Sequence, residues 1–351
     1  MSAVATETGT RGDARPQRRS TWASVRVWLT VTIVFCLLAD LAVRLAEPHL
    51  AQPVAWPTPE LQDKYDGVTK LAPGHHVRTV LFGDSMMDAG GDPALMHQVP
   101  GITYNASLAG ETLGTIATWA TNVVVPRLHP TTVVLGFNIN ALNPNIPGLA
   151  NSQKTYKSSR VAEVAGGGGD IADHLDKFLR DHVALYEYRS VLRKVFQPRS
   201  GSDSTVYDPP LSSLGWNETF RSLHYNDGPG TTTVAQGLSE TKGDLLFNFA
   251  VGSTEERQLG DLIERLHHEG ARVVLAVMPV ANDFTTAPHG GQAAYGAALI
   301  DLLDIGHSHG ALVVSPGVWS NSYFASPAHL NAAGTLRFST LLALDLARAD
   351  R

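Results

Sequence analysis

The sequence predicts an α/β protein built on a parallel sheet, and three observations carry this prediction. Short apolar runs rich in Val, Ile and Leu recur between residues 77 and 351, as is typical of parallel strands buried on both faces. Stretches with helical periodicity follow or separate these runs, and the alternation favours helices on both faces of the sheet. Of the 351 residues, 43% are hydrophobic and 17% charged, so the chain is long enough to bury a core.

The chain opens with a basic tail, residues 1–25, followed by an apolar segment, residues 26–46. Residues 1–46 hold six Lys or Arg and three acidic residues, a net charge of +3. Positive charge before an apolar run keeps the amino terminus in the cytoplasm. The uncharged core of the segment is shorter than the ~20 residues a spanning helix needs, so a cleaved signal peptide competes with a signal anchor. We favour the anchor, because a spanning helix can carry Asp40 and Arg44 near its outer end and no clear cleavage site follows.

Residues 47–76 are rich in proline and polar residues and are predicted to be a linker. The globular domain is therefore expected to span residues 77–351. The single cysteine, Cys36, lies in the apolar segment, so the part beyond the membrane can form no disulfide and has no thiolate nucleophile.

Within the globular domain the pattern predicts five strands and several helices. The expected strands are residues 77–82, 102–106, 132–137, 271–278 and 311–315. The expected helices are residues 111–128, 170–196, 253–268, 291–309 and 331–349. Residues 197–250 are rich in Gly, Ser, Thr, Asp and Pro with scattered aromatics, and they are predicted to be a long insertion over the active face.

One serine hydroxyl is expected at the carboxyl end of the first strand. The triplet Gly83-Asp84-Ser85 stands where that strand stops and a helix should start, and α/β sheets carry their chemistry at that edge. His329 lies far downstream at a loop-to-helix boundary. A serine and a histidine in these places point to a nucleophile and its general base, and so to acyl transfer.

Four short blocks resemble those of the SGNH (GDSL-like) hydrolase superfamily and occur in that family's order. They are residues 82–85, 105–112, 136–138 and 326–331. The resemblance implies a three-layer, flavodoxin-like fold with a five-stranded parallel sheet. It further implies Ser85 as nucleophile, His329 as base and then acid, and an oxyanion hole made of the Ser85 and Gly110 backbone N–H groups and the Asn138 side-chain amide.

The chain departs from the family pattern at two positions. The family usually has an aspartate three residues before the histidine, and Ser326 stands there. The block around Asn138 usually continues with aspartate and here continues with Ile139. A serine hydroxyl or a backbone carbonyl can still fix the histidine tautomer. A Ser85–His329 dyad supported by Ser326 is therefore expected, with a degenerate site as the alternative.

The arrangement resembles membrane-tethered SGNH proteins that move acyl groups on cell-surface polysaccharides. It implies an extracytoplasmic esterase or O-acyltransferase of the cell membrane, acting on acylated carbohydrate or a small acyl ester, beside a membrane acyltransferase if it has a partner. A lipase or thioesterase-like hydrolase and a non-catalytic glycan-binding module are the alternatives. The net charge of −9 outside residues 1–46 argues against nucleic acid. No cofactor is implied, and the paired histidines lack metal-binding spacing.

Overall fold

The computed structural model describes residues 19–50, 59–72, 74, 77–146, 175, 178–179, 182–189, 192, 211–225 and 233–349. It divides into two compact units: residues 1–53 with 175–198, and residues 54–174 with 199–351. Most of the helix expected at residues 170–196 lies outside the described residues; the described part includes α9 (Ala184–Glu187).

The first unit is dominated by α1 (Arg19–Ala46), which runs into the short helix η1 (Glu47–His49). Among the described helices, one stretch, Ser24–His49, is long and apolar enough to cross a membrane. Its apolar side chains are exposed over most of its length, and a membrane anchor or a signal sequence would both look like this. Near its carboxyl end Val43 packs against Ala184 and Tyr188, and the Asp40 carboxylate accepts the Leu185 N–H at 2.8 Å.

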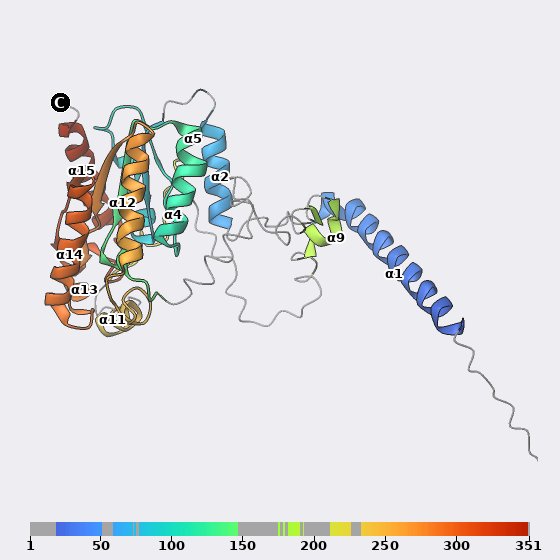
Figure 1. Ribbon diagram of the computed structural model, residues 1–351. Helices are drawn as coiled ribbons and strands as arrows, with labels where there is room; N and C mark the ends of the chain where they lie inside the picture. Colours follow the sequence, from blue (N-terminus) through green and yellow to red (C-terminus); the bar gives the residue numbers. More distant parts are fainter. Residues whose placement is uncertain are drawn as a thin grey trace, which may run out of the picture. The chain divides into compact units, whose positions relative to one another are not determined.

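The second unit confirms the predicted α/β class (Figure 1). Five parallel strands lie in the order β2-β1-β3-β4-β6. Their bounds are β1 Val77–Gly83, β2 Ile102–Asn105, β3 Thr132–Phe137, β4 Arg272–Val277 and β6 Leu312–Val314. A separate pair, β5 (Val280–Ala281) and β7 (Val318–Trp319), is also parallel.

Helices cover both faces of the large sheet, and alternate strand residues point to each face. Val80 and Phe82 pack with one set of helices, whereas Leu81 packs with the other. The first set contains α2 (Pro59–Leu71), α4 (Leu113–Trp119), α5 (Val125–Leu128) and α12 (Ser253–His268). The second contains α3 (Ser85–Gly90), α13 (Asn282–Thr286) and α15 (Ala332–Ala349), and α14 (Gly291–Ser308) contributes to both.

The remaining elements are short and connect the larger ones. They are η2 (Pro93–Leu95), the π-helical turn η3 (Ala120–Val124) between α4 and α5, η4 (Ile139–Leu142), α11 (Val234–Gly243) and η5 (Asn321–Tyr323).

The structure corrects the expected linker at residues 47–76. Residues 59–71 form the helix α2, and this helix belongs to the second unit. Its Leu61 and Val68 side chains are buried in the core. Composition pointed to a spacer because α2 is short and strongly polar; its two buried apolar residues lie on the face toward the sheet.

Candidate active site

Ser85 begins helix α3 directly after strand β1, and two neighbours fix that sharp turn. A Cβ on Gly83 would lie 2.3 Å from the Gly136 carbonyl oxygen, so only glycine lets β1, β3 and α3 approach so closely. Asp84 caps the helix: one carboxylate oxygen accepts the Met86 N–H at 2.9 Å and the other accepts the Asn140 amide at 2.7 Å. The Ser85 hydroxyl is therefore held at the carboxyl edge of the sheet.

Ser85 and His329, which are 244 positions apart, meet in the folded chain. The Ser85 Oγ lies 2.9 Å from His329 Nε2, and the Ser326 Oγ lies 2.8 Å from His329 Nδ1. The Ser326 hydroxyl oxygen also accepts the His329 backbone N–H at 3.2 Å. If Nδ1 carries the proton and donates it to Ser326, Nε2 is free to accept from Ser85. This is the tautomer that a general base requires.

The His329 ring is packed between protein groups. Phe220, from the expected insertion, stacks on it with ring centroids 4.2 Å apart and an angle of 17° between the planes. Burial lowers the pKa of His329 to about 4, because the cationic ring would lose its hydration. The ring is thus neutral at neutral pH, and its Nδ1 partner is a hydroxyl instead of a carboxylate.

Gly110 lies in the loop after β2 with a positive φ of 71°, a backbone conformation that glycine adopts without strain. Among the residues that the structure describes, nothing stands within 4 Å of the place where a Cβ would be. The loop is tied to β1, because the Ala106 N–H donates to the Leu81 carbonyl at 2.8 Å and the Leu108 N–H donates to the Gly83 carbonyl at 2.9 Å. No described residue therefore blocks the approach to the Gly110 backbone on the side where a Cβ would stand.

The Asn138 side-chain amide, which was expected to be an oxyanion donor, is bonded to backbone groups inside the protein. Its Nδ2 donates to the Met278 carbonyl at 2.5 Å, and its Oδ1 accepts the Ile139 N–H at 2.7 Å. The side chain is fully buried. The amide that reaches the nucleophile turn is that of Asn140, through Asp84. Asn140 lies two positions beyond the end of the third block, residues 136–138, and so was not among the residues expected in the site.

A cavity of about 250 Å³ lies beside His329 and Ser326. The cavity has a mixed lining. Its apolar side chains include Phe220, Leu223 and Leu245, and its polar ones, from α11 and the residue after it, include Glu240, Thr241 and Asp244. The insertion expected at residues 197–250 thus contributes Phe220 and α11 around the histidine. Across the residues that the structure describes, no group of three or more His, Cys, Asp or Glu side chains is placed to hold a metal ion.

Comparison with solved structures finds similar chains, at low identity. The lipase/acylhydrolase from Enterococcus faecalis is 12% identical with a TM-score of 0.37, and the match covers 78% of this chain and 97% of that one. An acetyl xylan esterase (Est2A) from the rumen bacterium Butyrivibrio proteoclasticus is 7% identical with a TM-score of 0.33, and the match covers 79% of this chain and 65% of that one. No family model and no curated protein matches the chain. At these scores the likenesses carry no conclusion about activity.

Proposed function

We propose that this chain is an SGNH-type serine esterase or O-acyltransferase that works through an acyl-enzyme on Ser85. The observation that carries the proposal is the row of hydrogen bonds from Ser85 through His329 to Ser326 at the carboxyl edge of the sheet. A nucleophile within hydrogen-bond reach of a base that a third group orients is the arrangement that covalent acyl transfer requires.

The reaction follows from that geometry. As the Ser85 Oγ attacks the ester carbonyl carbon, its proton moves to His329 Nε2. The negative charge that develops on the carbonyl oxygen would be held by the backbone N–H groups of Ser85 and Gly110. His329 then gives the proton to the departing alcohol, and the acyl group stays on Ser85. A water or a sugar hydroxyl then gives its proton to His329 and attacks the acyl carbonyl carbon, the bond to Ser85 Oγ breaks, and His329 returns the proton to that oxygen. Water makes the protein an esterase and a sugar makes it a transferase.

We place the catalytic domain outside the cytoplasm, anchored by α1, with acylated carbohydrate as the substrate class. The basic residues before an apolar helix support this orientation. A membrane acyltransferase that hands over activated acyl groups would be a suitable partner for a transferase held at the membrane.

A non-catalytic module is the second candidate, and one observation favours it. A hydroxyl replaces the usual carboxylate beside His329, and burial lowers the pKa of the ring to about 4. A histidine with so low a pKa is a weaker base, so transfer of the Ser85 proton to it is less favourable than transfer to an ordinary histidine.

Active-site labelling separates the two candidates. The full chain in detergent is incubated with a fluorophosphonate probe, and an activated acetyl ester is used to follow turnover. We expect a mass shift on Ser85 and turnover in the natural chain, and neither in Ser85→Ala or His329→Ala. Because the two residues act in one covalent cycle, the double variant should be no worse than either single one. Absence of label and turnover in the folded natural chain would rule out the enzyme and favour the module.

A further inference from the structure

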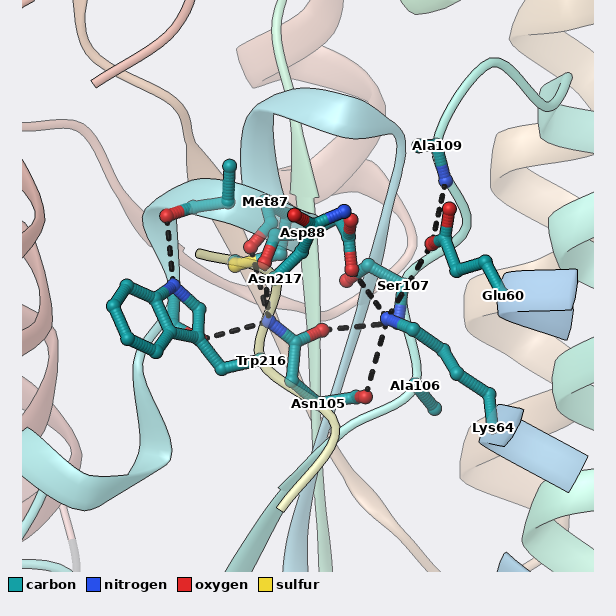
Figure 2. Close-up of polar contacts among 12 residues, drawn as sticks. Glu60, Lys64, Met87, Asp88, Asn105, Ala106, Ser107, Ala109, Trp216 and Asn217 are labelled. Atoms are coloured by element: carbon teal, nitrogen blue, oxygen red, sulfur yellow. Dashed lines mark hydrogen bonds and ion pairs between the residues drawn. The ribbon is translucent and has the colours of Figure 1, made fainter. Parts of the chain in front are cut away.

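A buried charged cluster lies beneath the candidate active site and takes no part in the proposed reaction. Lys64 of α2 is 0% exposed and Asp88 of α3 is 1% exposed. The Lys64 ammonium is bonded to an Asp88 carboxylate oxygen, donates to the Asn105 carbonyl at 3.4 Å, and lies 3.9 Å from a carboxylate oxygen of Glu60 (Figure 2). A cation and two carboxyl groups thus share one small volume of the interior.

Stability alone does not account for this cluster. Removing charges from water costs several kcal/mol per ion by order of magnitude, and apolar replacements of buried ion pairs are often as stable or more so. The network is also incomplete: within the described part of the chain, the second Asp88 carboxylate oxygen and the Ser107 hydroxyl are buried without a hydrogen-bond partner. Incompletely satisfied buried networks are costly.

The cluster joins the two backbone segments that carry the proposed oxyanion donors. On one side, Asp88 lies one helical turn after Ser85 on α3. The Asn105 amide fastens the end of the same helix by donating to the carbonyl oxygens of Met87, Asp88 and Gly91 at 3.1, 3.1 and 2.7 Å.

On the other side, the cluster reaches the loop that carries Gly110. The Glu60 carboxyl group accepts the Ala109 N–H at 3.4 Å, and the peptide bond after Ala109 contains the Gly110 N–H. Burial and the nearby Asp88 raise the pKa of Glu60 to about 7, so this group is partly protonated near neutral pH. Figure 2 shows Lys64 between Glu60 and Asp88, with Ala109 at one end of the row of contacts.

We propose that Lys64 is a positioning residue for the oxyanion hole. Through Asp88 it holds α3, and through Glu60 and the Asn105 carbonyl it holds the loop after β2, so its ammonium sets the distance between the Ser85 and Gly110 N–H groups. Lys64 touches neither the substrate nor the reacting atoms. The inference rests on the proposed esterase or transferase activity and adds a residue that the family blocks do not contain.

The test uses Lys64→Met in the full chain, because methionine keeps much of the side-chain length without the charge. Turnover of an activated acetyl ester gives kcat and KM, and a boronic acid that forms a tetrahedral adduct on Ser85 reports the oxyanion hole directly. A misplacement of about 1 Å can cost 10²-fold in rate, so we expect kcat to fall by roughly 10- to 100-fold. KM should stay within about twofold, and the boronate inhibition constant should rise by the same factor as kcat falls.

Two further variants separate positioning from folding. Val68→Ala removes a fully buried apolar side chain from the same helix, and it should lower the melting temperature without changing kcat or boronate affinity. Lys64→Met/Asp88→Leu removes both charges, so it should fold even if the single variant leaves Asp88 too costly to bury. It should show the same loss of kcat and boronate affinity.

Natural kcat and boronate affinity in either folded Lys64 variant would overturn the inference, as would an equal loss in Val68→Ala. Failure of the proposed function is recognised separately, because the natural chain itself would then show no turnover and no boronate adduct.

Discussion

His329 has a hydroxyl at each of its ring nitrogens, Ser85 at Nε2 and Ser326 at Nδ1. A hydroxyl can accept the Nδ1 proton and so allows the tautomer that a general base needs, but unlike a carboxylate it can also donate to Nδ1 and does not by itself impose that tautomer. It gives much less electrostatic stabilisation to the imidazolium that forms when Ser85 loses its proton. In the proposed enzyme the histidine is thus well oriented and weakly basic.

The first prediction concerns the pH dependence of kcat/KM for an activated ester. The base must be neutral, and burial lowers the pKa of His329 to about 4. We expect activity to stay level from neutral pH down to about pH 5 and to halve near pH 4, whereas an unperturbed histidine would halve it near 6.5.

Folding must be followed over the same pH range, for instance by circular dichroism. In the unfolded chain the histidine takes up its proton near pH 6.5, and in the folded chain only near pH 4. This residue's contribution to stability is therefore present above about pH 6.5 and is lost as the pH falls toward 4. An activity limb near pH 6.5 with the fold intact, and still present in Glu60→Gln so that it does not come from that carboxyl group, would contradict the prediction.

The second prediction concerns Ser326→Asp. A carboxylate at this position should stabilise the imidazolium, raise kcat on the order of 10-fold, and move the acid limb of the pH profile upward. Ser326→Asn is the matched control, since it is polar and uncharged, and it should show neither change. If kcat and the acid limb of the pH profile are both unchanged in Ser326→Asp, the added carboxylate does not stabilise the imidazolium of His329.

At the level of elements, the Asn138 amide joins the end of β3 to the chain after β4. Asn138→Ala would leave the Met278 carbonyl without its donor, and we expect the free energy of unfolding to fall by roughly 1–3 kcal/mol. Because the amide is bonded to Met278, kcat should change only a few-fold, whereas loss of an oxyanion donor costs about 10²–10³. Denaturant unfolding and kcat are measured together; a 10²-fold loss of kcat at unchanged stability would show that the amide turns to the oxyanion during reaction.

The sequence predicts the five strands of the large sheet to within two residues at each end, and it predicts Ser85, His329 and Ser326 as neighbours through the family blocks. Buried parallel strands are continuous apolar runs, which composition reveals directly. Helix α2 was missed because its buried surface includes a lysine, and only tertiary contacts with Asp88 and Asn105 place that side chain inside. The direction of the Asn138 amide was equally hidden, since the Met278 carbonyl that binds it is 140 positions away.

At the level of the whole molecule, the apolar helix at the amino terminus should decide where the active site works. A topology reporter fused after Leu50 should be active outside the cytoplasm, and the full protein should sediment with membranes, because basic residues precede the apolar run. Release of a shortened soluble protein would instead show that the segment is a cleaved signal peptide.

Helix α2 also affects how a soluble version of this protein should be made. The most convenient place to cut is just before β1, where the alternation of strands and helices begins. A fragment cut there lacks Lys64, the ion-pair partner of the buried Asp88. Removal of one partner of a buried ion pair lowers the free energy of unfolding by about 3–5 kcal/mol. The cut also strips Leu61 and Val68 from the core. Such a fragment would be expected to express poorly and lose turnover even if all four sequence blocks were present, so a usable boundary lies ahead of Pro59.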